Sequence, residues 1–211
     1  MQTPIETVNQ VYENYANSLN HEMPNLEIGQ DRSRVKHYRA ISDHLFSDLT
    51  LEKRHGSTKN VSLNKVGIGD VSCTKTFFEN SSLDMSSFLP IGRDGWGRVK
   101  REIPIDVTTL DLYCQQNRIA YISTLKVDTQ GLDLDVLKGS EDLLANHRIQ
   151  LILMEITFIE IYDGIPPFDE VFRFLADRNF KLVSFYKFYY KNGLAGWTDA
   201  LFINPDFTPF S

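Results

Sequence analysis

The second half of the sequence alternates apolar strands with amphipathic helices, and this alternation constrains the fold more than any other feature. Residues 121–128 and 149–157 are apolar runs of strand length, and the second is continuous enough for a strand covered on both faces. Each run precedes a segment with apolar residues at three- and four-residue spacing, over 132–144 and 168–175. Such alternation requires right-handed crossovers, so we predict an α/β fold with a doubly wound, mostly parallel sheet and helices on both faces.

The end of the sequence predicts a hairpin. Residues 181–190 and 197–204 have strand character and are joined through the turn sequence Lys191-Asn192-Gly193. We expect this hairpin to add an antiparallel edge to the sheet. The first of its strands carries a cluster of aromatic residues, namely Phe185, Tyr186, Phe188, Tyr189 and Tyr190. Such a cluster usually packs in the core or at a sheet edge; the alternatives are the wall of a substrate pocket or a contact between copies of the protein.

The first half shows weaker periodicity, and neither a repeat nor a Gly/Ser linker divides it from the second half. We therefore expect one domain over residues 1–211. Thr108 or Thr109 is the expected N-cap of the helix that follows, and Pro167 suits the first turn of the helix over 168–175. The remaining predicted elements are helices over 5–20, 41–53 and 110–117, strands over 35–40, 61–69, 74–78 and 99–107, and a long surface loop over 79–97.

Charge and cysteine usage argue against several classes of protein. The 211 residues carry a net charge of −6, whereas a nucleic-acid-binding surface requires a basic stripe. Cys73 and Cys114 are far apart and the five histidines show no metal-ligand spacing, so we expect neither a disulfide framework nor a metal site. The start shows no signal-peptide pattern, and the most apolar stretch, 151–162, contains Glu155 and Glu160 and is too short to span a bilayer. We therefore expect a cytoplasmic protein without a membrane partner.

Ligands of doubly wound sheets bind beyond the carboxyl ends of the strands, and three polar positions are expected there. Asp128 ends an apolar strand just before a helix, where a carboxylate either orients a substrate hydroxyl or accepts backbone N–H groups. Glu155 interrupts a buried apolar strand, which is costly unless the carboxyl group is paired, and this favours a functional role. Gly69-Asp70 follows another strand, where Asp70 either receives the exocyclic amine of an adenine or forms an ordinary turn.

Several short motifs occur in a specific order, although each of them alone is unspecific. They are Val107-Thr108-Thr109-Leu110-Asp111, Leu125-Lys126-Val127-Asp128-Thr129-Gln130-Gly131, Val136-Leu137-Lys138-Gly139-Ser140, Met154-Glu155 and Thr198-Asp199-Ala200-Leu201-Phe202. As a series they cover roughly residues 61–205, and the series resembles the FkbM-type methyltransferases. A different α/β nucleotide-binding protein would fit the topology but not this series of motifs.

The resemblance implies a Rossmann-like fold, S-adenosylmethionine as cofactor, and O-methylation of a hydroxyl group on a sugar or other small molecule. It places Gly69 and Asp70 by the adenine and Asp128 beside the methyl-transfer position, which makes these three the expected cofactor-binding residues. Asp128 is also the expected catalytic residue that orients or deprotonates the acceptor hydroxyl, with Glu155 as the second catalytic candidate. The implied partner is a small-molecule or glycan acceptor, and self-association into a homo-oligomer is an open alternative.

Residues 1–60 depart from the pattern of this family. Its members open with a strand that ends in an Asp-x-Gly-Ala-x-x-Gly-like loop, and no such loop precedes Asn60. The best match to the second strand, 35–40, has Arg39 where a ribose-binding carboxylate is expected, and arginine cannot accept hydrogen bonds. We therefore expect 1–60 to be a degenerate or truncated cofactor-binding part whose first strand is missing, which would leave apolar surface open on the neighbouring strands. The alternative function is a non-catalytic, degenerate or truncated relative that serves binding or oligomerisation.

Overall fold

The computed structural model describes residues 38–41, 62 and 64–207. The protein divides into two compact units, Met1–Val35 and Lys36–Ser211, and all described residues belong to the second unit. The helix predicted over 5–20 and almost all of the helix predicted over 41–53 therefore lie outside the described residues. Of the strand predicted over 35–40, the described part is observed as β1 (Tyr38–Ile41).

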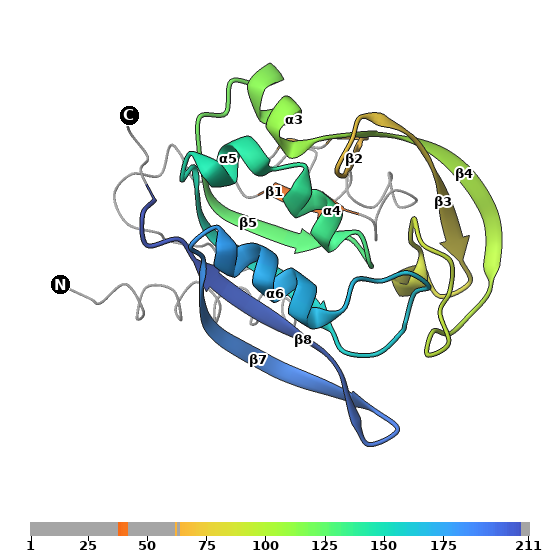
Figure 1. The fold of residues 1–211 in the computed structure, drawn as a ribbon. Coiled ribbons are helices and arrows are strands. Elements are labelled where there is room, and N and C mark those ends of the chain that lie inside the picture. The colour runs from red at the N-terminus through yellow and green to blue at the C-terminus, as the bar shows by residue number, and fades with distance from the viewer. Residues whose placement is uncertain (1–37, 42–61, 63, 208–211) are drawn as a thin grey trace. The chain divides into compact units, whose positions relative to one another are not determined.

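A five-stranded sheet with the strand order β1-β5-β6-β8-β7 forms the centre of this unit (Figure 1). Its further strands are β5 (Ile122–Asp128), β6 (Ile149–Thr157), β7 (Lys181–Lys191) and β8 (Leu194–Ile203). The two apolar runs of the sequence are β5 and β6, and both are interior strands. β5 is paired on both edges, by β1 and by β6, so the open edge that we expected beside a missing strand is not found on β5.

One strand of this sheet, β8, runs opposite to the other four. β1, β5 and β6 run parallel to one another, whereas β8 pairs antiparallel with both β6 and β7. The predicted α/β class and the terminal hairpin are confirmed, and the hairpin turns at Asn192 and Gly193 with φ values of 53° and 78°. The sheet is mixed rather than mostly parallel, because the hairpin supplies two of the four strand pairings.

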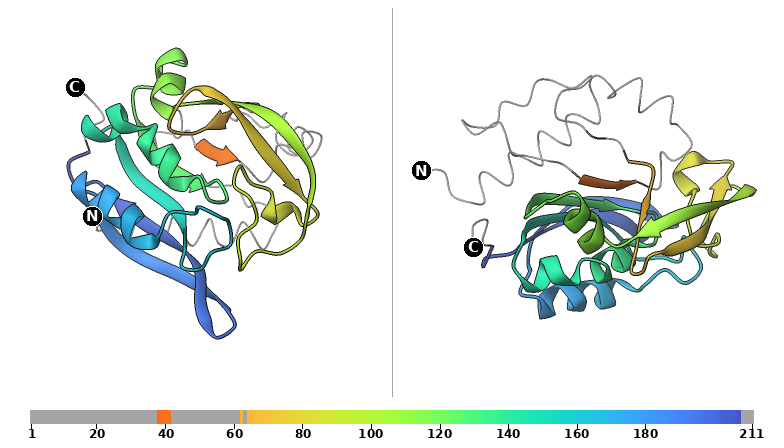
Figure 2. Two further views of the ribbon diagram at one scale, coloured as in Figure 1. Left: turned by 45° about the vertical axis from the view of Figure 1, so that its right-hand side comes forward. Right: turned by 90° about the horizontal axis from the view of Figure 1, so that it is seen from above.

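Helices α4 (Asp133–Lys138), α5 (Glu141–Ala145) and α6 (Phe168–Asp177) lie side by side over one face of this sheet (Figures 1 and 2). Alternate strand residues pack against them in one core: Leu125, Val127, Ile152, Met154, Ile156, Ala200 and Phe202. The residues between these point to the opposite face, since side chains alternate along a strand. Helices were expected on both faces of the sheet, and the described part of the protein contains the helices of one face. None of its helices is long and apolar enough to cross a membrane.

The single helix predicted over 132–144 is interrupted at Gly139-Ser140, which separates α4 from α5. Ser140 Oγ donates to the Val136 carbonyl at 2.6 Å and is fully buried. A Cβ atom on Gly139 would lie 1.9 Å from the carbonyl oxygen of Gly69, so this backbone approaches the turn after β2 (Gly67–Ile68) too closely for any side chain. The apolar spacing continues through the interruption, which is why the sequence predicted one helix.

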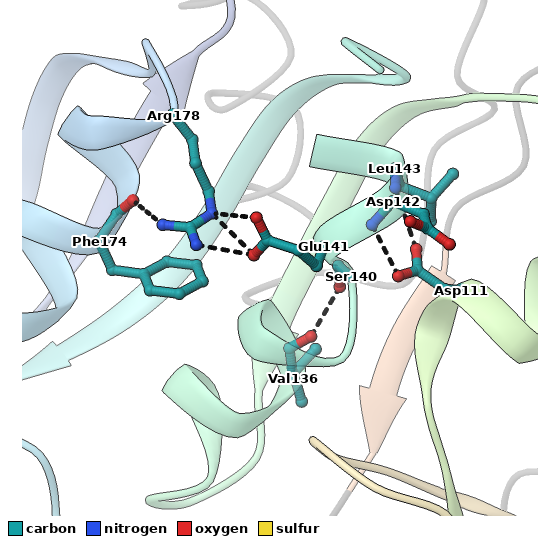
Figure 3. Close-up of polar contacts among 8 residues, drawn as sticks. All are labelled: Asp111, Val136, Ser140, Glu141, Asp142, Leu143, Phe174 and Arg178. Carbon is teal, nitrogen blue, oxygen red and sulfur yellow. Dashed lines mark hydrogen bonds and ion pairs between the residues drawn. The ribbon is translucent and has the colours of Figure 1, made fainter. Parts of the chain in front are cut away.

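Helix α3 (Leu110–Gln116) begins at the expected cap, and its first turn also caps α5. Thr109 Oγ1 accepts a hydrogen bond from the backbone N–H of Leu112 at 3.1 Å. The Asp111 carboxylate accepts the backbone N–H groups of Asp142 at 2.8 Å and Leu143 at 3.0 Å (Figure 3). Because Ser140 makes no side-chain cap, Asp111 satisfies the N-terminus of α5 from another helix.

A charged contact joins α5 to α6. The Arg178 guanidinium donates to the Glu141 carboxylate, with Nη2 at 2.7 Å and Nε at 2.9 Å from Oε2 (Figure 3). The same guanidinium lies 3.5 Å from the centroid of the Phe174 ring and donates to the Phe174 carbonyl. Helices α3, α5 and α6 are therefore linked through polar groups on one side of the core.

A second, three-stranded sheet with the order β2-β4-β3 was not expected as a separate layer. β3 (Cys73–Asn80) pairs antiparallel with β4 (Val99–Thr108), and β2 pairs parallel with β4. The strand predicted over 61–69 is reduced to the two residues of β2. Residues 81–98, most of the predicted loop, contain the short 3₁₀ helix η1 (Leu83–Met85) and join β3 to β4.

Candidate functional site

Three carboxylate residues form a row across neighbouring strands of the five-stranded sheet. Asp128 is the last residue of β5, and the pairing of Val127 with Met154 places it beside Glu155 on β6. Glu155 is in turn the direct partner of Asp199 on β8. All three alternate with core residues on their strands, so the row lies on the sheet face opposite α4, α5 and α6.

Lys126 supplies a positive charge on the same face, two residues before Asp128. Its Nζ atom lies 2.9 Å from Asp199 Oδ1 and 3.7 Å from Asp128 Oδ2. The lysine side chain is only 12% exposed and that of Asp128 15%, so these charges are screened far less than a surface pair would be. Lys126 thereby links the two ends of the carboxylate row.

Glu155 has the most strongly perturbed environment in this row. Burial raises its pKa well above the usual value of 4.5, and the negative charges of Asp128, Asp133 and Asp199 raise it further. Lys126 opposes this effect but does not outweigh it. Glu155 therefore keeps its proton to a higher pH than an ordinary glutamate does, and in its protonated form the carboxyl group can donate a hydrogen bond.

Asp133 adds a fourth carboxyl group at the start of α4. Its two oxygens accept the backbone N–H groups of Thr129 at 3.1 Å and Gly131 at 3.2 Å, which closes the turn between β5 and α4. Burial raises the pKa of Asp133 to about 6, the nearby Asp128 charge adds to this, and the two backbone hydrogen bonds only partly oppose it. The turn is thus built around a carboxyl group that titrates close to neutral pH.

Gln130 fixes the Asp128 carboxylate from the same turn. Gln130 Nε2 donates to Asp128 Oδ1 at 3.0 Å, while its Oε1 accepts a hydrogen bond from the Tyr162 hydroxyl at 2.7 Å. The Thr129 hydroxyl between them is buried, and it has no hydrogen-bond partner within the part of the protein that the structure describes. Burying a hydroxyl group without a hydrogen-bond partner is costly. The turn therefore contains a hydroxyl group whose hydrogen-bonding capacity its own residues do not use.

Gly69 and Asp70 follow β2, the short strand of the other sheet. The Gly69 N–H donates to the Thr108 carbonyl at 2.9 Å, and Asp70 Oδ1 lies 3.1 Å from Lys75 Nζ. Burial would raise the pKa of Asp70, but the hydrogen bond and charge of Lys75 outweigh it, and the pKa is lowered. Asp70 is therefore a charged acceptor. Lys75 also contacts Asp135 of α4 at 3.3 Å, which ties this turn to the helix that begins at Asp133.

A small cavity of about 20 Å³, about the space of one water molecule, lies at part of this site. Its walls come from the start of α4, the end of β6 and the segment that leads into α6. Glu155 and Asp133 are its ionisable residues, and the remainder is mostly apolar, with Met154, Ile156, Ile165, Pro166, Phe168 and Val171.

The structure thus brings Asp128 and Glu155 together, and α4 connects them to Gly69-Asp70 through Lys75. The sequence analysis did not identify Lys126, Asp133, Asp199 or Tyr162 as site residues. Lys126 was detectable, because its two-residue spacing from Asp128 puts both on one strand face. Among the described residues no group of His, Cys, Asp and Glu side chains has a metal-binding arrangement. The assigned roles of Gly69, Asp70, Asp128 and Glu155 remain predictions.

Comparison with known proteins gives one match. The family model described as "Methyltransferase FkbM domain" matches residues 4–182. The match thus includes most of the segment 1–60, which we expected to depart from the family pattern, and it ends at the beginning of β7. Searches of curated proteins and of solved structures found no match.

Proposed function

The chain belongs to the FkbM methyltransferase family, and on this premise we propose that it transfers a methyl group from S-adenosylmethionine to a hydroxyl group of a sugar or other small molecule. The observation that carries the proposal is the pair Asp128 and Glu155, which lie side by side on neighbouring strands, with burial and adjacent carboxylates raising the pKa of Glu155. The net charge of −6 further supports a partner that is not a nucleic acid.

The described residues fit such a cofactor in three respects. Among the side chains that the structure describes at this site, the carboxyl groups of Asp128, Asp133 and Asp199 outnumber the cation of Lys126, which suits a sulfonium cation. The charged Asp70 is an acceptor for an adenine amine, since Lys75 contacts one of its two oxygens. The buried Thr129 hydroxyl offers a further donor in the turn after Asp128. When bound, S-adenosylmethionine supplies an electrophilic methyl group at its sulfur.

The chain's own contribution is to orient the acceptor hydroxyl and take up its proton. Asp128 is suited to this task, because Gln130 and Lys126 stabilise it as a carboxylate. Glu155 is less suited to be the base, since its raised pKa favours the protonated form. We therefore assign the base role to Asp128 and a hydrogen-bond-donor role to Glu155.

Calorimetric titration of the full chain with S-adenosylmethionine and S-adenosylhomocysteine tests cofactor binding directly. We expect saturable heat with a dissociation constant below about 1 mM for both ligands. The absence of heat at millimolar ligand contradicts the proposal and favours the non-catalytic alternative. A screen of sugars and other small hydroxyl compounds with isotope-labelled cofactor then identifies the acceptor.

Asp128→Asn tests the base role separately from binding. We expect turnover to fall by about 10²- to 10⁴-fold while cofactor affinity changes little, because the amide preserves the shape but cannot accept the proton. Asp177→Asn is the matched control, since Asp177 is an exposed acid at the end of α6. Turnover of Asp128→Asn equal to that of the control contradicts the assignment.

A further inference from the structure

Two hydrogen bonds in series lead from a buried tyrosine to Asp128. The Tyr162 hydroxyl donates to Gln130 Oε1 at 2.7 Å, and Gln130 Nε2 donates to Asp128 Oδ1 at 3.0 Å. We propose that Gln130 and Tyr162 are positioning residues that fix the orientation of the Asp128 carboxylate. This inference rests on the proposed function, because it assigns Asp128 the role of orienting and deprotonating the acceptor.

The two hydrogen-bond partners of Gln130 determine the orientation of its side-chain amide. If the amide were reversed, its oxygen would lie about 3 Å from a carboxylate oxygen, and two acceptors repel each other at that distance. The present orientation gives both ends a favourable partner, since the amide nitrogen meets the carboxylate and the amide oxygen meets a hydroxyl donor. Gln130 Oε1 is the nearest acceptor of the Tyr162 hydroxyl, since the Asp84 carbonyl at 3.3 Å and Met85 Sδ at 3.8 Å are farther away.

Tyr162 is itself held firmly, so it can serve as the fixed end of the series. It is 2% exposed and packs with Met85 and Ile161 in a small core of its own. Its backbone forms an isolated antiparallel bridge with Ile91, in the segment that joins β3 to β4. The position of its hydroxyl is therefore set by packing that is independent of Gln130 and Asp128.

The backbone of Gln130 is anchored as well. Its φ of 53° lies in the left-handed region, which a residue with a side chain adopts at a cost of about 1–2 kcal/mol. The Ser87 hydroxyl donates to the Gln130 carbonyl at 2.5 Å and holds this conformation. Gln130 is thus fixed at its backbone by Ser87 and at its amide by Tyr162.

The consequence for Asp128 is that each of its oxygens has a defined neighbour. Gln130 contacts Oδ1, and Lys126 lies 3.7 Å from Oδ2. Lysine is a flexible point charge and tolerates rotation of the carboxylate, whereas a planar amide donor defines a direction. Gln130 therefore controls orientation, and Lys126 contributes mainly charge.

A double-mutant cycle on the full-length protein tests this role. Gln130→Leu is expected to lower kcat by about 10- to 100-fold, and Tyr162→Phe by about 3- to 10-fold, with the KM for S-adenosylmethionine changed less than about twofold. Because Tyr162 acts through Gln130, the double variant is expected to match Gln130→Leu alone. Tyr190→Phe, which removes a hydroxyl from an exposed tyrosine, is the matched control and should leave kcat unchanged.

A nuclear magnetic resonance readout is independent of turnover. In the wild-type protein, the hydrogen bond to Asp128 should separate the two side-chain amide proton resonances of Gln130, and Tyr162→Phe should shift them. Wild-type kcat in Tyr162→Phe, multiplicative effects in the double variant, or Gln130 resonances unchanged by Tyr162→Phe would each overturn the inference. If the wild-type protein binds no cofactor, the proposed function fails instead, and the resonances alone decide whether Tyr162 orients Gln130.

Discussion

Glu155 shows how a single strand residue acquires an unusual protonation state. It lies between Asp128 and Asp199 in the carboxylate row, and Lys126, whose charge lowers its pKa, is engaged by both of these neighbours. Burial penalises its charged form, and the neighbouring carboxylates add repulsion. Glu155 therefore keeps its proton to a higher pH than usual, beside the Asp128 carboxyl group that Gln130 and Lys126 contact.

Glu155→Gln should stabilise the protein increasingly as the pH rises. The pKa of Glu155 is higher in the folded state than in the unfolded state, so the wild-type protein loses stability as the pH rises above the unfolded value of 4.5. Glutamine resembles the protonated carboxyl group and does not titrate. We expect the free energy of unfolding of the variant, measured in urea from about pH 5 to about pH 9, to exceed that of the wild type by a growing margin.

Exposed Glu102→Gln is the control for this comparison, because its carboxyl group is solvated in both states. A margin for Glu155→Gln that stays constant with pH, or shrinks, would show that Glu155 is charged in the folded protein.

Single site residues were predictable only where one strand determines their position. Asp128 and Glu155 stood out because each follows or interrupts an apolar run, and the structure places them side by side. The proximity of Asp199 depends on the register between β6 and β8, and no pattern within either strand encodes that register. Asp133 was missed because its environment is created by the turn that it closes, rather than by periodicity.

Helix α5 depends on a cap that comes from another helix. It has only five residues, so its own backbone cannot stabilise it, and the N-terminal N–H groups of Asp142 and Leu143 need an external acceptor. Asp111 supplies both acceptor oxygens from the first turn of α3. The contact couples the formation of α3 and α5.

Asp111→Ala should lower the free energy of unfolding by about 1–2 kcal/mol, because two backbone donors lose their acceptor. Asp111→Asn keeps one acceptor oxygen and should lose about half as much. Urea unfolding followed by circular dichroism measures both, with exposed Asp177→Ala as the control. Equal stability of Asp111→Ala and the control would show that water replaces the carboxylate without cost.

The boundaries of the larger elements followed from the sequence, and those of the smaller ones did not. β6 spans the predicted residues 149–157, because a strand buried on both faces is apolar throughout and ends where polarity returns. β2 was predicted as nine residues and has two, since it is held by parallel pairing with β4 and not by a pattern of its own. The break between α4 and α5 reflects a backbone contact with Gly69, which no helical periodicity signals.

Across the described part of the chain, the candidate site lies where interior strands meet a connecting turn. β5 has a neighbour on each edge, and its carboxyl end carries Asp128 and the Gln130 turn. The core beneath α4, α5 and α6 lies on one face of the sheet, and the carboxylate row lies on the other, together with buried Leu151, Leu153 and Leu201. Both faces of these strands therefore contribute to the stability of the fold.

The far end of the β7–β8 hairpin makes little contribution to the stability of the fold. Tyr190 is 68% exposed and Leu194 66%, so the double substitution Tyr190→Ser and Leu194→Ser should change the free energy of unfolding by less than about 0.5 kcal/mol. Phe202→Ala, which removes a core ring, should cost about 3–5 kcal/mol in the same urea experiment. A loss above about 1.5 kcal/mol in the double variant would show that another surface covers these side chains.

The contact between Gly139 and the Gly69 carbonyl also limits how this protein can evolve. A side chain at position 139 would collide with backbone, and no substitution elsewhere can shorten a backbone carbonyl to make room. Most core clashes can be relieved by a smaller neighbour, but this one can be relieved only by moving the turn or by lengthening the connection between the two helices. A substitution of Gly139 therefore cannot be compensated by a second substitution alone. A protein that loses this glycine must change the backbone of the Asp70 turn at the same time.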